Sequence, residues 1–492
     1  MSNYEWISID TSADYQRLEA LLEADFQPKV VVEKLQNSIT DAVKGILIEY
    51  GYVDKDYRST YYHFYAKKGR RYRDDCVRLH LFDATVSFDP KGLNLNGPDS
   101  SLGDHYFGYV VLRPTMTATI GRSILSPDVR TGARGSAIQS DHVVHVLGHT
   151  LKVWGFPSMA QHADISVCAH VSCWAILRHY SERYASHREL LIHDITMMAH
   201  PFDPGGLTPA LGLNVAQAER IFQAAGSYPL IVSKKFKKDD DTYVDHAFFV
   251  QMLAYLESGF PLFVAMYGQE HAIVAIGHEW RPTPPPSAQA TTHVWQWVDS
   301  ISAVDDNRLP YERVPVQADG IHRYSANDFD SFIVSLPDKI FYPADAVERQ
   351  SEAMLPLVEA YLSPKPDGAM LRRYFIMTLS GLRKYARENQ SQLGTTLVSE
   401  IMRMSSARFI WIVEYATVEQ WASGHIHARA ILDATASPND AVPVWHIHNE
   451  QQLIVFDRST AASGAGIIDL NRPDGAQISR IEQNLRPIKN NS

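Results

Sequence analysis

The sequence predicts an α+β protein of several domains, and three observations support this fold class. The chain has 492 residues, enough for about three domains of roughly 150 residues each. Segments with helical spacing of apolar residues alternate with short β-rich segments. No repeat with a fixed period is present, which excludes solenoids and propellers. We expect a central domain at 151–343, between an N-terminal α+β accessory domain at 1–150 and a C-terminal α+β accessory domain at 344–492.

The composition is that of an ordinary globular protein. Apolar residues make up 45% and charged residues 21% of the chain, and the net charge is −10. This acidic balance disfavours nucleic acid as a partner. Three cysteines are too few for a disulfide framework. The N-terminus lacks a secretory signal pattern, and no segment reaches the roughly 18 apolar residues of a membrane span. We therefore expect a cytoplasmic protein without a membrane partner.

The N-terminal part combines both kinds of secondary structure. Apolar residues near a 3.6-residue period begin at Leu18 and continue through 30–50, which predicts helix. The segments 77–82 and 106–112 are rich in β-forming residues and predict strands. This mixture is typical of an α+β domain.

The C-terminal part has a similar mixture. A helical stretch is expected from 344 to about 404, followed by strands at 409–413 and 428–432. The proline-rich loop at 281–292 is expected to be a surface insertion in the central domain. The tail after Pro473 is expected to be held loosely.

The most informative segment is 161–180, where a polar loop runs into a helix with apolar periodicity. Cys168 falls at the junction. With Ser166 as the N-cap, Cys168 lies in the first turn, where free backbone N–H groups and the helix dipole favour a thiolate. Gln161, seven positions upstream, is a candidate side-chain donor to an oxyanion hole. The alternative for Cys168 is a buried structural thiol.

Cys173 is the rival nucleophile, and helical phase argues against it. One apolar stripe contains Cys173, Ile176, Leu177 and Tyr180. Residues at this spacing share one helix face, which predicts that Cys173 packs into the core.

A thiolate nucleophile needs a base, and His271 is the candidate. It begins the second of two apolar strands, 103 positions after Cys168. The near-continuous apolar character of this strand predicts burial on both faces. His278 lies at an odd offset on the same strand, so it is expected on the opposite face.

The next strand ends with a candidate for the third member of the site. Asp305 follows the strand, and a carboxylate there can accept the imidazole N–H and fix its orientation. A regular strand turns Asp306 the other way, but the choice between Asp305 and Asp306 stays open. The sequence Asp-Asp-Asn is also typical of a chain reversal.

Together these residues resemble papain-like cysteine peptidases, and most of all the bacteriocin-processing peptidases that remove double-glycine leaders. In chain order, the resemblance is carried by Phe156-Pro157, Gln161, Cys168-Ala-His, His271-Ala-Ile-Val-Ala-Ile-Gly and Val304-Asp305-Asp306-Asn307. Gln161 stands one position further from the cysteine than the glutamine of that group. The helix expected near 212–222 resembles the segment between cysteine and histidine in these enzymes. The resemblance covers about 154–342.

The resemblance implies a cysteine-bearing helix packed on an antiparallel sheet that bears the histidine and the aspartate. It implies Cys168 as nucleophile, His271 as base, Asp305 as orienting acid and Gln161 as oxyanion donor. The implied activity is cysteine-dependent hydrolysis of a peptide or isopeptide bond through a thioester. The expected partner is a peptide or protein substrate. No cofactor is implied.

Two other function classes remain open. A transglutaminase-like acyl transferase uses the same Cys-His-Asp order, with an amine as acceptor, and a faint similarity of 431–435 to the aspartate strand of those enzymes points the same way. A catalytically inactive peptidase-like sensor or scaffold is the other alternative. No metal is predicted, because the closely spaced histidines at 142–149, 425–427 and 446–448 lack the cysteine pair or carboxylate of a zinc set.

Overall fold

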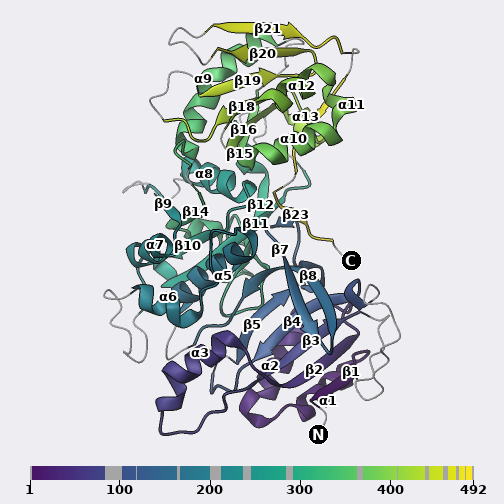
Figure 1. Ribbon diagram of the computed structural model, residues 1–492, viewed down its shortest axis with the longest axis vertical. Coiled ribbons are helices and arrows are strands. Elements are labelled where there is room, and N and C mark those ends of the chain that lie inside the picture. The colour runs from purple at the N-terminus through teal and green to yellow at the C-terminus, as the bar shows by residue number, and fades with distance from the viewer. Residues whose placement is uncertain are drawn as a thin grey trace.

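The protein is a mixed α+β molecule built on three antiparallel sheets, as its computed structural model shows (Figure 1). The residues described are 3–83, 102–117, 119–162, 167–199, 212–236, 245–283, 292–338, 340–362, 369–406, 408–437, 443–457, 464–472, 476–482 and 484–489. In Figure 1 the N-terminal sheet lies at the bottom, the central sheet in the middle and the C-terminal sheet at the top. The predicted α+β class is confirmed.

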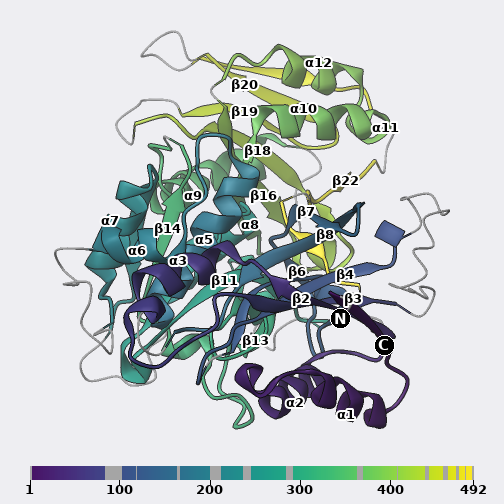
Figure 2. The same cartoon turned by 60° about the horizontal axis from the view of Figure 1, so that its bottom comes forward.

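The N-terminal sheet has seven strands in the order β1-β2-β3-β4-β5-β8-β7. Its elements are β1 (Tyr4–Ser8), α1 (Ser12–Leu21), α2 (Pro28–Ser38), β2 (Gly45–Tyr52), α3 (Lys55–His63), β3 (Cys76–Phe82), β4 (Tyr106–Leu112), β5 (Ile120–Leu125), β7 (Ser140–Val146) and β8 (His149–Ser158). In Figure 2, α1 and α2 lie side by side at the lower edge of the molecule. Strands β3 and β4 confirm the predictions for 77–82 and 106–112.

The central sheet has the order β13-β12-β11-β10-β14-β9, and the short strand β6 joins it at β11. Its elements are β6 (Ser136–Ala137), α5 (Cys168–Arg183), α6 (Ile192–Ala199), α7 (Val215–Ala224), β9 (Tyr228–Ser233), α8 (His246–Glu257), β10 (Leu262–Met266), β11 (His271–Trp280), β12 (Val298–Val304), β13 (Glu312–Pro315) and β14 (Ser331–Leu336). Helix α7 confirms the helix expected near 212–222. Most of the expected loop at 281–292 lies outside the described residues.

The C-terminal sheet has the order β15-β16-β18-β19-β20-β21. The elements of this part are α9 (Ala344–Tyr361), β15 (Leu371–Thr378), α10 (Leu379–Glu388), α11 (Gln390–Leu393), α12 (Thr395–Arg403), β16 (Phe409–Ala416), α13 (Val418–Ala422), β17 (His425–Ile426), β18 (Ala428–Asp433), β19 (Val444–His448), β20 (Gln452–Phe456), β21 (Ala465–Asp469), β22 (Ile478–Ser479) and β23 (Arg486–Pro487). Strands β16 and β18 confirm the two strands predicted in this part of the chain.

Two helical predictions are wrong over part of their length. The segment 30–50 ends in strand β2, and the stretch 344–404 is interrupted by strand β15. Part of each strand is a short run of consecutive apolar residues, 46–48 in β2 and 374–377 in β15. A short apolar run of this kind carries no period that separates a strand from a buried helix.

The tail after Pro473 is not held loosely where it is described, which corrects the prediction. Strand β22 pairs with β17, and β23 pairs with β6 beside the central sheet. The side chains of Ile478, Ile481 and Ile488 are buried. The tail therefore runs from the C-terminal part back to the central sheet.

The N-terminal sheet extends beyond the boundary expected at residue 150, since its strand β8 ends at Ser158.

The inner strands β10 and β11 are buried on both faces, as the sequence predicts for the strand that begins at His271. On β10, Phe263 and Ala265 point into a core shared with α5. Their neighbours Leu262, Val264 and Met266 point into a second core shared with α8. This alternation follows from the two-residue period of a strand. The sheet is therefore held in place between two helices.

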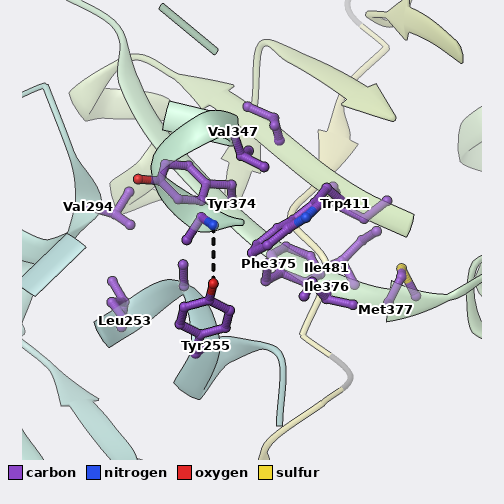
Figure 3. Close-up of a cluster of buried hydrophobic side chains, with 14 of the residues drawn as sticks. Leu253, Tyr255, Val294, Val347, Tyr374, Phe375, Ile376, Met377, Trp411 and Ile481 are labelled. Carbon is purple, nitrogen blue, oxygen red and sulfur yellow. Dashed lines mark hydrogen bonds between the residues drawn. The ribbon is translucent and has the colours of Figure 1, made fainter. Parts of the chain in front are cut away.

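The second core continues without a break into the C-terminal part. It joins α8 to α9 and to the strands β15, β16 and β18. Figure 3 shows this contact, where Tyr255 of α8 lies beside Phe375 and Trp411, and its hydroxyl accepts a hydrogen bond from the backbone of Ala344. Among the described residues, no helix is long and apolar enough to cross a membrane.

Buried charges also connect the central and C-terminal parts. Arg373 on β15 donates to Glu257 at the end of α8, with its Nε 2.7 Å from the carboxylate, and to Glu414 on β16 at 2.8 Å. His278 on β11 bonds to the same Glu257. Burial alone would raise the pKa of Glu257, but Arg373 and His278 lower it to about 2. The Glu257 carboxylate is therefore ionised at neutral pH.

Removing the central cation of this network should destabilise the protein strongly. Arg373→Met leaves two buried carboxylates without their shared partner, for which we expect a loss of about 3–5 kcal/mol. Arg349→Met, which removes an exposed pair with Asp345, should cost less than about 1 kcal/mol. Urea unfolding followed by tryptophan fluorescence measures both, and equal losses would contradict the structural role of the network.

Candidate active site

Cys168 is the first residue of helix α5. Val167 is the N-cap with extended backbone angles, whereas the expected N-cap, Ser166, lies outside the described residues. The first N–H groups of a helix have no partner within the helix, and they carry the positive end of its dipole. The thiol of Cys168 is half-buried at this end, in the environment that a reactive cysteine needs.

The other two cysteines are fully buried. Cys173 packs in the core between α5 and the central sheet, and burial raises the pKa of its thiol. Cys76 lies on β3 inside the N-terminal part, and burial raises the pKa of its thiol too. The prediction that Cys173 belongs to the core is confirmed.

His271 is the first residue of β11. A short turn at Tyr267–Gln269 connects β10 to β11, and Glu270 closes it in the left-handed region with φ 48°. His271 then pairs with Met266 across the hairpin. The tight turn therefore determines where the His271 ring lies, on the cavity wall near the start of α5. His271 lines the same cavity as Cys168 and lies within electrostatic range of its thiol.

Asp305 directly follows the last residue of β12, beside β11. Its Oδ1 lies 3.1 Å from Nε2 of His271. Because Nε2 is hydrogen-bonded to Asp305, Nδ1 is the ring nitrogen that remains available to Cys168. The structure thus brings three of the predicted residues together: Asp305 is hydrogen-bonded to His271, and His271 shares a cavity wall with Cys168.

Further hydrogen bonds hold the carboxylate of Asp305. The hydroxyl of Tyr324 donates to Oδ2 at 2.7 Å, and the backbone N–H of Asn307 donates to Oδ1 at 2.9 Å. The side-chain amide of Asn307 donates to Oδ1 at 3.1 Å and to Asp306 at 2.9 Å. Sequence reasoning missed Tyr324, because no local pattern links it to a residue 19 positions away.

The electrostatics of the site favour an ionised pair. Burial by itself lowers the pKa of His271, but its bonds to Asp305 and Cys168 and their charges outweigh burial and raise it to about 10. Burial opposes ionisation of Asp305 as well, yet His271, Asn307 and Tyr324 hold its pKa well below the usual range. His271 is therefore an imidazolium at neutral pH, between a carboxylate and the thiol.

Asp306 lies behind this pair and differs from Asp305. Its nearer oxygen is 3.9 Å from Nε2 of His271, beyond hydrogen-bond distance. Burial and the neighbouring charge of Asp305 raise the pKa of Asp306 to about 7, against the opposing effect of His271. The geometry thus decides for Asp305 as the partner of the imidazole, and Asp306 changes charge near neutral pH.

Cys168 and His271 open into a cavity of about 760 Å³. Apolar side chains form much of its wall: Val167, Leu213, Val215, Phe263, Ala265 and Met266. The amides of Asn214 and Gln217 and the carboxylate of Glu270 add polar groups. Its size, and a lining that is about equally polar and apolar, are compatible with a ligand site.

Gln161 is half-buried near the end of β8, just before a gap in the described chain. The cavity wall, as far as it is described, does not include Gln161. Its role as an oxyanion donor therefore stays a prediction. Gln217 at the start of α7 is a side-chain amide within this wall that sequence reasoning missed.

The remaining candidates lie elsewhere. His278 faces away from the cavity and bonds to Glu257, in agreement with its odd offset from His271. Asp433, in the segment with faint similarity to transglutaminases, accepts two hydrogen bonds from Thr435 in a turn after β18. His271, Asp305 and Asp306 offer ligand atoms within 4.8 Å of one another. A cation there would have to compete with the bond between His271 and Asp305.

Comparisons with protein-family models, with curated proteins and with solved structures gave no match for this chain. The assignment of the site therefore rests on its own geometry.

The pH dependence of cysteine alkylation tests this site without a substrate. In the folded protein iodoacetamide should modify Cys168 alone, because Cys76 and Cys173 are buried. His271→Gln should slow the reaction at pH 6 by about 10-fold or more, because the thiolate loses its cation. Peptide mapping identifies the modified residue. Labelling of Cys173 in the folded protein would contradict this arrangement.

Asp306 should give the alkylation rate an inflection near pH 7. As pH rises through this value, Asp306 becomes anionic near His271, which is already an imidazolium, and offsets part of the positive charge that favours the thiolate. The rate should therefore rise less steeply above this pH, and Asp306→Asn should remove this inflection. An unchanged profile in Asp306→Asn would show that another group titrates there.

Proposed function

We propose that this protein is a cysteine-dependent hydrolase that cleaves peptide or isopeptide bonds through a thioester intermediate. The observation that carries the proposal is the grouping of Cys168, at a helix N-terminus, with the hydrogen-bonded pair of His271 and Asp305 at one cavity. The resemblance of 154–342 to papain-like peptidases supports the same conclusion.

The chemistry follows from the positions of these groups. The thiolate of Cys168 attacks the carbonyl carbon of the substrate, and its new C–S bond gives a tetrahedral oxyanion. The backbone N–H groups at the start of α5 are donors for this oxyanion. His271 gives its proton to the leaving amine as the C–N bond breaks, while Asp305 holds the ring. Water, deprotonated by His271, then releases the acyl group from the thioester.

Removal of the nucleophile tests the proposal directly. Cys168→Ala should lower the turnover of a cleaved peptide by about 10³-fold or more, because the covalent route is lost. Cys173→Ala should keep most of it, because that thiol lies in the core. A peptide library analysed by mass spectrometry detects cleavage. Activity that survives in Cys168→Ala but not in Cys173→Ala would refute the assignment.

The acceptor separates hydrolysis from acyl transfer. With a labelled primary amine present, a hydrolase gives mainly the free acid, whereas a transglutaminase-like enzyme gives the amide of the labelled amine. A peptidase-like scaffold without activity gives neither product. We expect the free acid, since no feature of the described cavity wall favours an amine over water.

The charge of the cavity indicates the kind of substrate it accepts. Among the described wall residues outside the triad, Glu270 is the charged side chain, and no lysine or arginine accompanies it. Coulomb attraction at this position favours a neutral or cationic group near the scissile bond over an anionic one. The apolar wall binds an uncharged side chain beside it.

Charged thiol reagents measure this preference at Cys168. A trimethylammonium-ethyl methanethiosulfonate should react faster than its sulfonate counterpart, relative to a neutral reagent. Glu270→Gln should reduce the cation-to-anion rate ratio by about 3- to 10-fold, as expected for loss of one charge near the thiol. Glu352→Gln, on exposed α9, is the control. Equal ratios in both variants would show that Glu270 does not select charge.

A further inference from the structure

The loop that follows Asp305 docks into the N-terminal part of the protein. Leu309 is buried in the hydrophobic core formed by the N-terminal helices and sheet. Buried Arg130 donates from Nε to the carbonyl of Pro310 at 2.7 Å. The hydroxyl of Tyr311 accepts from the backbone of Phe156 at 2.7 Å and donates to the carbonyl of Leu125. Each contact joins this loop to a residue more than 150 positions away.

The backbone of this loop needs such support. Tyr311 has a φ of 68°, in the left-handed region that a bulky residue avoids. A conformation of this kind persists only where its surroundings enforce it. The contacts with Leu125 and Phe156 provide this enforcement from the N-terminal sheet.

Lys34 on α2 connects the N-terminal part to the triad itself. Its Nζ donates to the carbonyl oxygen of Asn307 at 3.0 Å, and Asn307 is the residue that bonds to both Asp305 and Asp306. Burial lowers the pKa of Lys34, and the charges of Asp305 and Asp306 oppose this effect. A half-buried ammonium group thus lies within electrostatic range of both carboxylates.

We propose that the N-terminal part holds the acid loop of the active site in position, and that Lys34 is a positioning residue that stabilises the ionised carboxylates behind His271. This inference rests on the proposed function, because it describes how the triad of that function is held. Lys34 contacts neither the cavity wall, as far as it is described, nor Cys168. It acts through Asn307 and the two aspartates.

Other ionisable groups also lie near Lys34 and the two aspartates. Arg308, on the same loop, repels Lys34. From β11, His271 faces Asp305 and Asp306, and the phenol of Tyr324 bonds to Asp305. Glu312 lies within electrostatic range of Tyr324. Loss of the Lys34 cation should therefore make Asp306 harder to ionise, which weakens the imidazolium of His271 at neutral pH.

The test is the pH profile of Cys168 alkylation in Lys34→Met. The inflection assigned to Asp306 should move to higher pH, because the cation that favours its ionised form is lost. Lys34→Arg should restore the profile, because it restores the cation. Lys29→Met removes an exposed lysine from the same helix and should leave the profile unchanged.

The outcomes separate this inference from the proposed function. If wild-type Cys168 reacts only after unfolding, or His271→Ala does not slow the reaction, the proposed function fails. If Cys168 and His271 behave as expected but Lys34→Met matches Lys29→Met, only the role of Lys34 is refuted. A loss of rate that is equal at every pH, or that Lys34→Arg does not restore, also refutes the electrostatic role. Circular dichroism confirms that each variant is folded.

Discussion

The whole arrangement depends on the burial of strand β11 on both faces. One face packs against α5, which carries Cys168, and the other packs against the core of α8 and the C-terminal sheet. The first residue of the strand is His271, and seven residues later His278 joins the buried charges around Glu257. At Gly277 a Cβ atom would lie 2.1 Å from the carbonyl of Ser136, so only glycine allows β6 to dock here. A shift of this strand by one residue would exchange its two faces and move the histidine out of the site.

The sequence was sufficient to predict the chemistry-bearing residues of the central part. Cys168 and His271 each begin an element, and Asp305 directly follows one, so cap, turn and strand-end signals predict their positions. Helical phase was enough to predict that Cys173 packs in the core. The errors arose at strands β2 and β15. Each contains a short run of consecutive apolar residues, and such a run has no period that identifies a strand.

Contacts between distant segments could not be predicted from local patterns. Tyr324 precedes β14, which is separated from β12 by two strands, yet its hydroxyl bonds to Asp305 after β12. No sequence pattern near residue 324 indicates this contact. Lys34 and Asn307 are 273 positions apart and meet only when the N-terminal sheet packs on the central one. The tail after Pro473 has a composition typical of a loose end, yet its isoleucines are buried and its last strand pairs beside β11. Tertiary burial determined each of these outcomes.

The three cores also explain why a single cysteine site needs such a long chain. The proposed chemistry requires a helix, a histidine strand and an acid held in register, and each of these contacts a different part of the protein. One core packs α5 against the central sheet, and the core shared with α8 packs against the opposite face of that sheet. The core of the N-terminal helices and sheet contains Leu309 from the acid loop. An ionised Asp305 beside an imidazolium is costly to bury unless its hydrogen bonds are complete. The N-terminal part completes them indirectly, because it holds Asn307 and the strained Tyr311 in place. The flanking parts are thus structural members of the active centre, and activity should depend on all three sheets remaining packed together.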